Sequence, residues 1–209
     1  MEENVTSTLV SNNSHTKITI RAAFASDIPY LPAIEQSASE VFKSIPDLEF
    51  IAADAPLSTD ILNSHLSSKL LWVATTREEK SGAEIPVAFL AAKCMKPARY
   101  EQQDVNVNSS KHLYIAECSV HSSFQRQGIA GRLLDTVAEY ARNQGFGWLT
   151  LITFLDVPWN GKFYQRHGFE EIEAEGMGDE YVELLKKELN QWKGWDPKRW
   201  RRGVMARKL

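Results

Sequence analysis

The stretch that decides the fold of this chain is QRQGIA, residues Gln125 to Ala130. It lies between an alternating apolar run at 112–121 (HLYIAECSVH) and the run 131–145 (GRLLDTVAEYARNQG), whose apolar residues repeat every three and four positions. The first pattern predicts a strand, and the second predicts an amphipathic helix over 127–143. A polar turn containing glycine therefore joins a strand to the start of a long helix.

This turn has the chemistry of a phosphate cradle. The first turn of a helix leaves backbone N–H groups unpaired and carries a partial positive charge, and both features attract phosphate. Gly128 lets the backbone approach a ligand closely, Ala130 is nearly as small, and Arg126 can add a charge-assisted contact. A helix start with a glycine for tight packing is the alternative. The sequence contains no GxxxxGK[ST] and no GxGxxG after its first strand, which excludes a P-loop and a dinucleotide Rossmann site.

Composition narrows the class of protein further. The chain has 209 residues, 43% of them hydrophobic, which is enough for one domain with a normal core. A net charge of −3 argues against a nucleic-acid binder. Cys94 and Cys118 lie in apolar runs and are interpreted as core thiols, and the absence of CxxC or histidine clusters argues against a metal site.

Hydropathy gives expectations for location. No apolar run reaches the roughly 18–20 residues of a membrane span, and the polar start MEENVTSTLVSNNSHT has no signal-peptide core. We therefore expect a cytoplasmic protein that does not associate with membranes. Residues 1–16 are expected to form a disordered tail before one domain at 17–209.

Apolar periodicity over 17–209 predicts a mixed α/β domain. The run 148–155 is almost continuously apolar, so we expect a central strand buried on both faces. The runs 70–75 and 85–95 are expected to pair as a hairpin. Strands are predicted at 17–22, 70–75, 85–95, 112–121, 148–155, 169–174 and 200–209. Helices are predicted from 26 or 27, from 58, and at 127–143, 158–166 and 181–192, with loops at 45–56 and 96–111.

The strand, QRQGIA and long helix together resemble the acyl-CoA-binding core of the GCN5-related N-acetyltransferase (GNAT) superfamily. The family motif Q/R-x-x-G-x-G/A is filled by Gln125, Gly128 and Ala130. Ala130 stands where glycine is commoner. The resemblance follows the order of elements over 17–209 and is specific over 113–169.

A second segment, VPWNGKFYQRHGF at 157–169, is similar to the next helix and strand of the family. The family has an Asn, an F-Y pair and a G-F here, which correspond to Asn160, Phe163-Tyr164 and Gly168-Phe169. The helix predicted at 181–192 would be inserted before the last strand, which departs from the family plan.

The resemblance implies a mixed sheet of six to seven strands with flanking helices, in which the central parallel strands 112–121 and 148–155 splay apart. It implies acetyl-CoA as co-substrate and no metal. The backbone of Cys118, Ser119 and Val120 would hold the pantetheine arm. The other residues implied to bind the cofactor are Gln125, Arg126, Gln127, Gly128, Ile129, Ala130, Gly131, Asn160 and Phe163.

The implied reaction is attack of a neutral amine on a thioester, which needs a base for the amine and an acid for the sulfur. Tyr164 matches the family tyrosine that serves the sulfur, and a phenol with a pKa of about 10 stays protonated at neutral pH. Glu117 is the candidate base, directly or through water, because a charge inside an apolar strand needs a reason. A solvent-facing or lysine-paired glutamate is the alternative, and His121 is a weaker candidate.

The acceptor side is implied to involve Glu35, Phe42 and the acidic loop 45–56. Asp156 can hold a substrate ammonium, and Trp159 can form a wall of the pocket. Packing or solvation explains the same residues without a substrate.

The function predicted from these features is acetyl transfer to a primary amine of a small molecule. Two alternatives remain at this point: an N-acetyltransferase for proteins or peptides, and a non-catalytic acyl-CoA-binding sensor. A homodimer is possible, because members of the family often dimerise.

Overall fold

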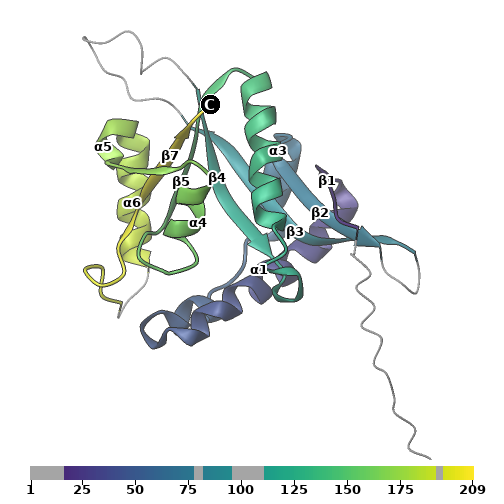
Figure 1. Cartoon of the computed structure of the whole chain (residues 1–209), viewed down its shortest axis with the longest axis horizontal. Coiled ribbons are helices and arrows are strands. Elements are labelled where there is room, and N and C mark those ends of the chain that lie inside the picture. Colours follow the sequence, from purple (N-terminus) through teal and green to yellow (C-terminus); the bar gives the residue numbers. More distant parts are fainter. Residues whose placement is uncertain (1–16, 78–81, 96–110, 192–194) are drawn as a thin grey trace, which may run out of the picture.

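The computed structural model describes residues 17–77, 82–95, 111–191 and 195–209. The expected tail at 1–16 and nearly all of the predicted loop 96–111 lie outside these ranges. The described residues form a seven-stranded mixed sheet in the order β1-β2-β3-β4-β5-β7-β6, with helices on both faces (Figure 1). None of the described helices is both long and apolar enough to span a membrane. The predicted class of fold is confirmed.

The first half of the sheet is antiparallel and consists of β1 (Thr19–Ala22), β2 (Leu71–Arg77) and β3 (Glu84–Met95). β2 and β3 pair from Leu71↔Ala91 to Arg77↔Glu84, which confirms the predicted hairpin. The segment between β1 and β2 forms η1 (Ala25–Tyr30), α1 (Leu31–Ser39), η2 (Glu40–Ser44), η3 (Pro46–Ala53) and α2 (Thr59–Ser67).

The predicted loop at 45–56 is wrong, because most of it is the 3-10 helix η3. Pro46 occupies its first turn, where a missing N–H costs nothing. Leu48 and Ala52 are spaced four apart and are both buried, so one side of η3 packs inward.

The centre of the sheet splays. β4 (Lys111–Val120) and β5 (Phe146–Phe154) pair in parallel from Lys111↔Phe146 to Tyr114↔Thr150. The pairing between these two fully described strands ends at Tyr114↔Thr150, although β4 continues to Val120 and β5 continues to Phe154. On its other edge β4 carries a bulge, since Ala91 of β3 faces Glu117 while Ala92 faces Ile115. A gap therefore opens between β4 and β5 beside Glu117.

The last part of the chain forms α4 (Gly161–Arg166), β6 (Glu170–Ile172), α5 (Ala174–Met177), α6 (Asp179–Gln191) and β7 (Arg202–Lys208). β7 lies between β5 and β6 and pairs antiparallel with both. The inserted helix predicted at 181–192 is confirmed as α6. α5 was not predicted, because four residues are too short for a periodic signal.

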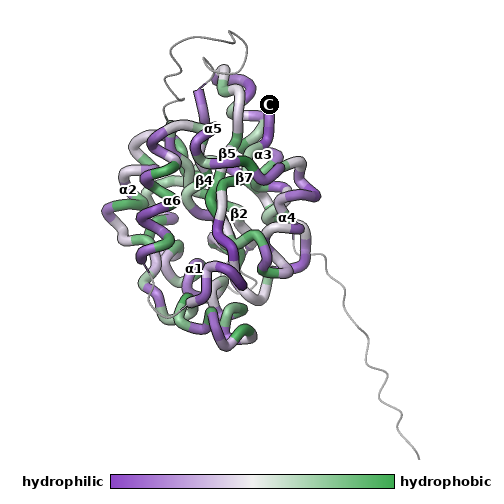
Figure 2. Tube along the Cα trace, turned by 90° about the vertical axis from the view of Figure 1, so that its left-hand side faces the viewer, coloured by the Kyte–Doolittle hydropathy of each residue, from purple (hydrophilic) through white to green (hydrophobic). Residues whose placement is uncertain are grey.

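The two faces of the sheet have separate cores. α3 (Ile129–Asn143) covers one face and buries Leu133, Leu134, Val137, Ala138 and Ala141. α1 and α2 cover the β1–β3 half of the other face, and α6 covers the β5–β7 half through the buried Tyr181. Hydrophobic residues accordingly concentrate on the central strands (Figure 2). The splay thus lies between α3 on one face and the α1/α6 side on the other.

Candidate active site

The turn before α3 has the geometry of a cradle. Gly128 is the N-cap residue of α3 with φ +74°, a left-handed conformation that side chains other than glycine rarely adopt. No side chain caps the helix, and a Cβ at Gly128 would meet no atom within 4 Å, so the space beside the first turn is open. Arg126, with φ +60°, is exposed next to it. These features fit the phosphates of a bound nucleotide.

The side chains of three other residues predicted to bind the cofactor make contacts within the protein. Gln125 Nε2 donates to the Val120 carbonyl at 3.1 Å, and Gln127 Nε2 donates to the Ser123 carbonyl at 3.4 Å. The Ile129 side chain is buried in the core, which leaves only its backbone for a ligand.

Sequence reasoning missed His167, which lies against the cradle. A Cβ at Gly131 would approach His167 Cε1 to 2.6 Å, so the first turn of α3 and the end of α4 are in close contact. The His167 ring also lies 4.7 Å from the Phe163 ring, centroid to centroid. In the sequence, this contact is indicated only by Gly131, a small residue that directly follows the motif.

The edge of β4 that faces the splay carries the groups assigned to the pantetheine arm. Cys118, Ser119 and Val120 pair with β3 on their other edge. The Cys118 N–H donates to Glu117 Oε1 at 3.0 Å, and the Val120 carbonyl accepts from Gln125. A ligand on this edge would compete with these bonds.

Glu117 is a carboxylate with two donors and a raised pKa. Ser119 Oγ donates to the same oxygen, Oε1, at 2.8 Å. Burial raises the pKa of Glu117, while the hydrogen bonds from Ser119 and Cys118 and the charge of Arg202 lower it. Within the described part of the chain the donors to this carboxylate are Cys118 and Ser119, and a carboxylate with a raised pKa is a better base.

Glu35 on α1 is a second carboxylate, and the charge of Glu117 acts on its pKa. Its Oε2 accepts from the Leu57 N–H at 3.0 Å. Burial raises the pKa of Glu35, the charge of Glu117 also raises it and the Leu57 hydrogen bond lowers it, and together they bring this pKa to about 8. Ser37 Oγ and Ser122 Oγ, 2.8 Å apart, fix α1 to the end of β4. This contact joins the helix that carries Glu35 to the segment that follows the strand of Glu117.

The raised pKa of Glu35 predicts a pH-dependent stability. The folded protein binds this proton more tightly than the unfolded chain, so the stabilisation is lost as pH rises from about 4.5 to about 8. Between pH 5.5 and 9, the free energy of unfolding should fall by about 1–3 kcal/mol more in the wild type than in Glu35→Gln. Urea unfolding at both pH values measures this difference. Glu139→Gln, exposed on α3, is the control, and equal pH dependence in wild type and Glu35→Gln would refute the prediction.

Tyr164 on α4 lies on the α3 side of the same gap. Its ring packs 5.1 Å from Phe163 and 5.6 Å from Phe169, centroid to centroid. Burial raises the pKa of Tyr164, and the charges of Cys118 and Glu117 raise it further. The phenol is held in its neutral form, as a proton donor must be. Tyr164 and Glu117 thus influence each other electrostatically across the splay.

Contacts between segments that are distant in the sequence join η2 and η3, the elements predicted to lie beside the amine acceptor, to the end of β5 and the segment before β7. Phe42 of η2 lies 5.8 Å from Trp159 and 6.1 Å from Phe154 between ring centroids. Trp159 Nε1 is buried without a hydrogen-bond partner. Asp47 of η3 pairs with Arg199 at 2.6 Å and accepts from Trp200 Nε1 at 3.1 Å. Asp47 therefore fastens η3 to the segment before β7, and its charge is already paired.

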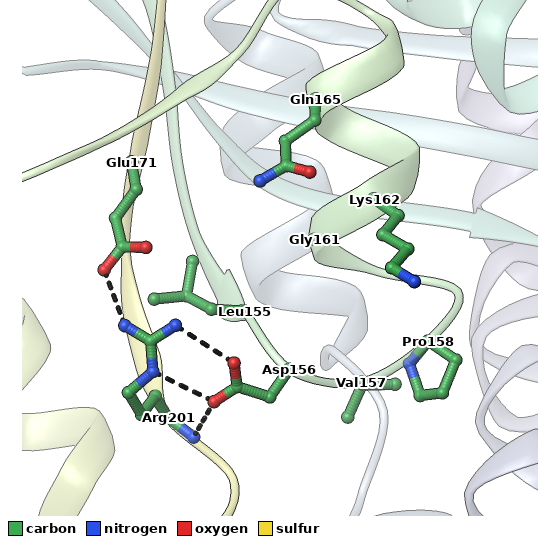
Figure 3. A pocket seen from close by; sticks show the side chains of 9 residues that line it. All are labelled: Leu155, Asp156, Val157, Pro158, Gly161, Lys162, Gln165, Glu171 and Arg201. Carbon is green, nitrogen blue, oxygen red and sulfur yellow. Dashed lines mark hydrogen bonds and ion pairs between the residues drawn. The ribbon is translucent and has the colours of Figure 1, made fainter.

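Asp156 lies in an ion pair rather than at the splay. Arg201 Nε and Nη2 each donate to the Asp156 carboxylate at 3.0 Å, which lowers the pKa of Asp156 (Figure 3). The two residues line a cavity of about 250 Å³ that also includes Lys162 and Glu171, but neither Glu117 nor Tyr164. Arg201 would compete with an ammonium for Asp156, whose role in substrate binding stays a prediction.

Asn160 and His121 have local structural contacts. Asn160 is the N-cap residue of α4, but its side chain makes no capping hydrogen bond to the helix, and its Nδ2 donates to Thr153 Oγ1 at 3.2 Å. His121 Nδ1 accepts from the Ser123 N–H at 3.3 Å and caps η4 (Ser122–Phe124). Among the residues that the structure describes, no cluster of His, Cys, Asp and Glu could hold a metal.

Residues 43–169 match the family model described as the acetyltransferase (GNAT) family. The match spans more than half of the chain and includes both sequence motifs, the splay, Glu117 and Tyr164. The chain therefore belongs to the GNAT family and is an acyltransferase.

Solved structures share this fold. One is N-acetylglutamate synthase from Neisseria gonorrhoeae with coenzyme A and N-acetyl-glutamate, with a TM-score of 0.59, 17% identity and coverage of 94% of this chain but 36% of that chain. Another is Arabidopsis thaliana NAA60 with a bisubstrate analogue, with a TM-score of 0.59, 14% identity and coverage of 92% and 98%. A third is the ribosomal-protein-S18-alanine N-acetyltransferase of Escherichia coli, with a TM-score of 0.54, 16% identity and coverage of 92% and 94%. The chain spans about a third of the first structure's length, and these identities establish the fold alone.

Proposed function

We propose that the chain transfers an acetyl group from acetyl-CoA to a primary amine of a small molecule. The observation that supports the proposal is the opening between β4 and β5, beside which β4 carries Glu117, together with the effect of the Glu117 charge on the pKa of Tyr164. One residue has the chemistry of a base and the other that of an acid, as amine acetylation requires.

The residues of the cradle fit the donor. Open space around Gly128, an uncapped α3 and the exposed Arg126 suit a pyrophosphate. The amides of residues 126–131 would hold it, and the free edge of β4 would hold the pantetheine arm. Acetyl-CoA, when bound, supplies a thioester whose acetyl carbon an uncharged amine can attack.

Glu117 and Tyr164 would move the protons. An amine arrives as an ammonium ion, and Glu117 would accept its proton directly or through a water. Glu35 adds a second carboxylate, and a cation between the two favours their charged forms. Tyr164 would keep its proton on the phenol oxygen until the sulfur needs it.

Contacts that cross the region predicted to bind the amine support a small-molecule substrate. Contacts of Asp47 with Arg199 and Trp200, and of Phe42 with Trp159, join η2 and η3 to segments near β5 and β7. An extended peptide needs an open groove, and these contacts would cross it. Protein N-acetylation is a second candidate, because NAA60 and the S18-alanine enzyme are among the similar folds.

Thiol release from acetyl-CoA tests the proposal, with pools of polyamines, amino acids, aryl amines and peptides. We expect release with a small amine, and we expect Tyr164→Phe to lower turnover by about 10–1000-fold while acetyl-CoA binding survives. Calorimetric titration with acetyl-CoA checks binding in both proteins. Release with peptides alone would establish the protein substrate, unchanged turnover in Tyr164→Phe would remove the acid, and tight binding without turnover would identify a sensor.

A further inference from the structure

A part-buried ion pair joins α6 to β7. Arg202 Nε lies 2.6 Å from Glu188 Oε2, and each side chain is only 15% exposed. Tyr114 OH donates to the other oxygen, Glu188 Oε1, at 3.4 Å. The guanidinium carbon of Arg202 lies 4.8 Å from the centroid of the Phe154 ring. Glu188 of α6 therefore contacts β4 and β7 directly, and Arg202 extends this network to β5.

The network lies where the sheet opens. Tyr114 belongs to the last pair between β4 and β5, Tyr114↔Thr150. Arg202 faces Phe154 at the end of β5, on the far side of the gap. The network thus links both walls of the splay, and Glu117 follows Tyr114 on the strand just beyond the bulge.

Electrostatic effects connect the pair with both proposed catalytic groups. Arg202 lowers the pKa of Glu117, and Glu188 raises it. Arg202 also lowers the pKa of Tyr164, which the nearby Tyr114 raises. The two charges of the pair therefore act on Glu117 in opposite directions.

We propose that Glu188 and Arg202 are positioning residues for acetyl transfer: α6 brings their ion pair to the splay, where it holds the Tyr114 hydroxyl and balances the charge around Glu117. The inference rests on the proposed function for the roles of Glu117 and Tyr164. If so, α6, the helix inserted before the last strand, contributes to the active site.

Burial distinguishes this pair from an ordinary surface contact. Removing two charges from water costs free energy that their attraction only partly returns, so a buried pair is a poor device for stability alone. On the same helix, Lys186 and Glu183 form a pair at 3.1 Å with 63% and 73% exposure, where such contacts contribute little. We therefore expect the Glu188–Arg202 pair to have a function besides stability, unlike the exposed Lys186–Glu183 pair.

The test measures the titration of Glu117 directly. Protein labelled with [5-¹³C]glutamate gives a carboxyl signal for Glu117, assigned by its loss in Glu117→Gln, and the signal is followed against pH. Glu188→Gln removes the negative charge, so the midpoint should fall by about 0.5–1 pH unit, and Arg202→Gln should raise it by a similar amount. The double variant should return close to the wild-type value.

The other titratable groups near Glu117 are the same in the wild type and in the Glu188 and Arg202 variants. The charges that act on the pKa of Glu117 are those of Glu188 and Arg202, and Glu117 in turn acts on the pKa values of its titratable neighbours Glu35, Cys118 and Tyr164. Only Glu188 and Arg202 change in these variants. Glu183→Gln, the same substitution on the exposed side of α6, should leave the midpoint unchanged.

The outcomes separate this inference from the proposed function. The acidic limb of the kcat/KM profile for an accepted amine should move with the carbon signal, down in Glu188→Gln and up in Arg202→Gln. Shifts in the same direction, or no shift in folded variants, would overturn the inference. Absence of any accepted amine would defeat the proposed function, while the carbon titration would still decide the role of the pair. If one single variant does not fold by circular dichroism, the other single variant decides: a shift in the stated direction supports the inference and an unchanged midpoint refutes it.

Discussion

Glu117→Gln is expected to lower kcat/KM for the amine acceptor by about 10²–10⁴-fold. Glutamine keeps the size of the side chain and an oxygen that can accept from Ser119 and Cys118, as Oε1 does at 2.8 and 3.0 Å. It cannot take a proton from an ammonium ion. The loss should therefore fall on the chemical step, with no collapse of the strand.

The pH profile distinguishes a lost base from a damaged fold. Without Glu117, the rate should rise with pH as solution supplies the uncharged amine, so the deficit against wild type should shrink at alkaline pH. Calorimetric binding of acetyl-CoA should stay within about threefold of wild type, because the cradle is untouched. Glu139→Gln, exposed on α3, is the matched control and should retain full activity. A variant Glu117→Gln with wild-type kcat/KM would show that another group, with Glu35 the next candidate, takes the proton.

The position of Glu117 shows where sequence reasoning succeeds and where it stops. Alternation of apolar residues identified β4, and the glycine turn identified the start of α3, because both signals are local. Strict alternation, however, places Glu117 on the same face as Leu113 and Ile115. In the structure Leu113, Ile115, Cys118 and Val120 all pack in the core under α3, so the alternation breaks at the bulge. A bulge depends on the partner strand, and one strand's sequence does not encode it.

The charged contacts of the site were missed for the same physical reason. Asp156 looked available for an ammonium, yet Arg201, 45 positions further along, binds it. Glu188 and Tyr114 meet across 74 positions. Such pairs leave no periodic signal, because each residue alone is compatible with a solvated surface. The fold followed from local patterns, whereas the charge balance of the site followed from long-range packing.

Gly161→Ala is expected to be among the most destabilising single substitutions in the chain. Gly161 is the first residue of α4, and a Cβ there would overlap the carbonyl oxygen of Leu155 and lie 3.0 Å from its carbonyl carbon. The obstacle is backbone, so no side chain can rotate away. We expect a loss of about 2–4 kcal/mol in the free energy of unfolding, or roughly 5–15 °C in Tm. Thermal and urea unfolding measure it.

A matched substitution separates this contact from the general effect of removing a glycine. Gly176 lies in the short helix α5, and a Cβ there would meet no atom within 4 Å. Gly176→Ala should be neutral or stabilising by up to about 1 kcal/mol, because alanine favours helix and restricts the unfolded chain. Equal effects of the two substitutions would refute the close approach of α4 to the end of β5. Because α4 carries Tyr164, the same approach sets the distance of the proposed acid from the splay, so turnover by Gly161→Ala should also fall at temperatures where the variant remains folded.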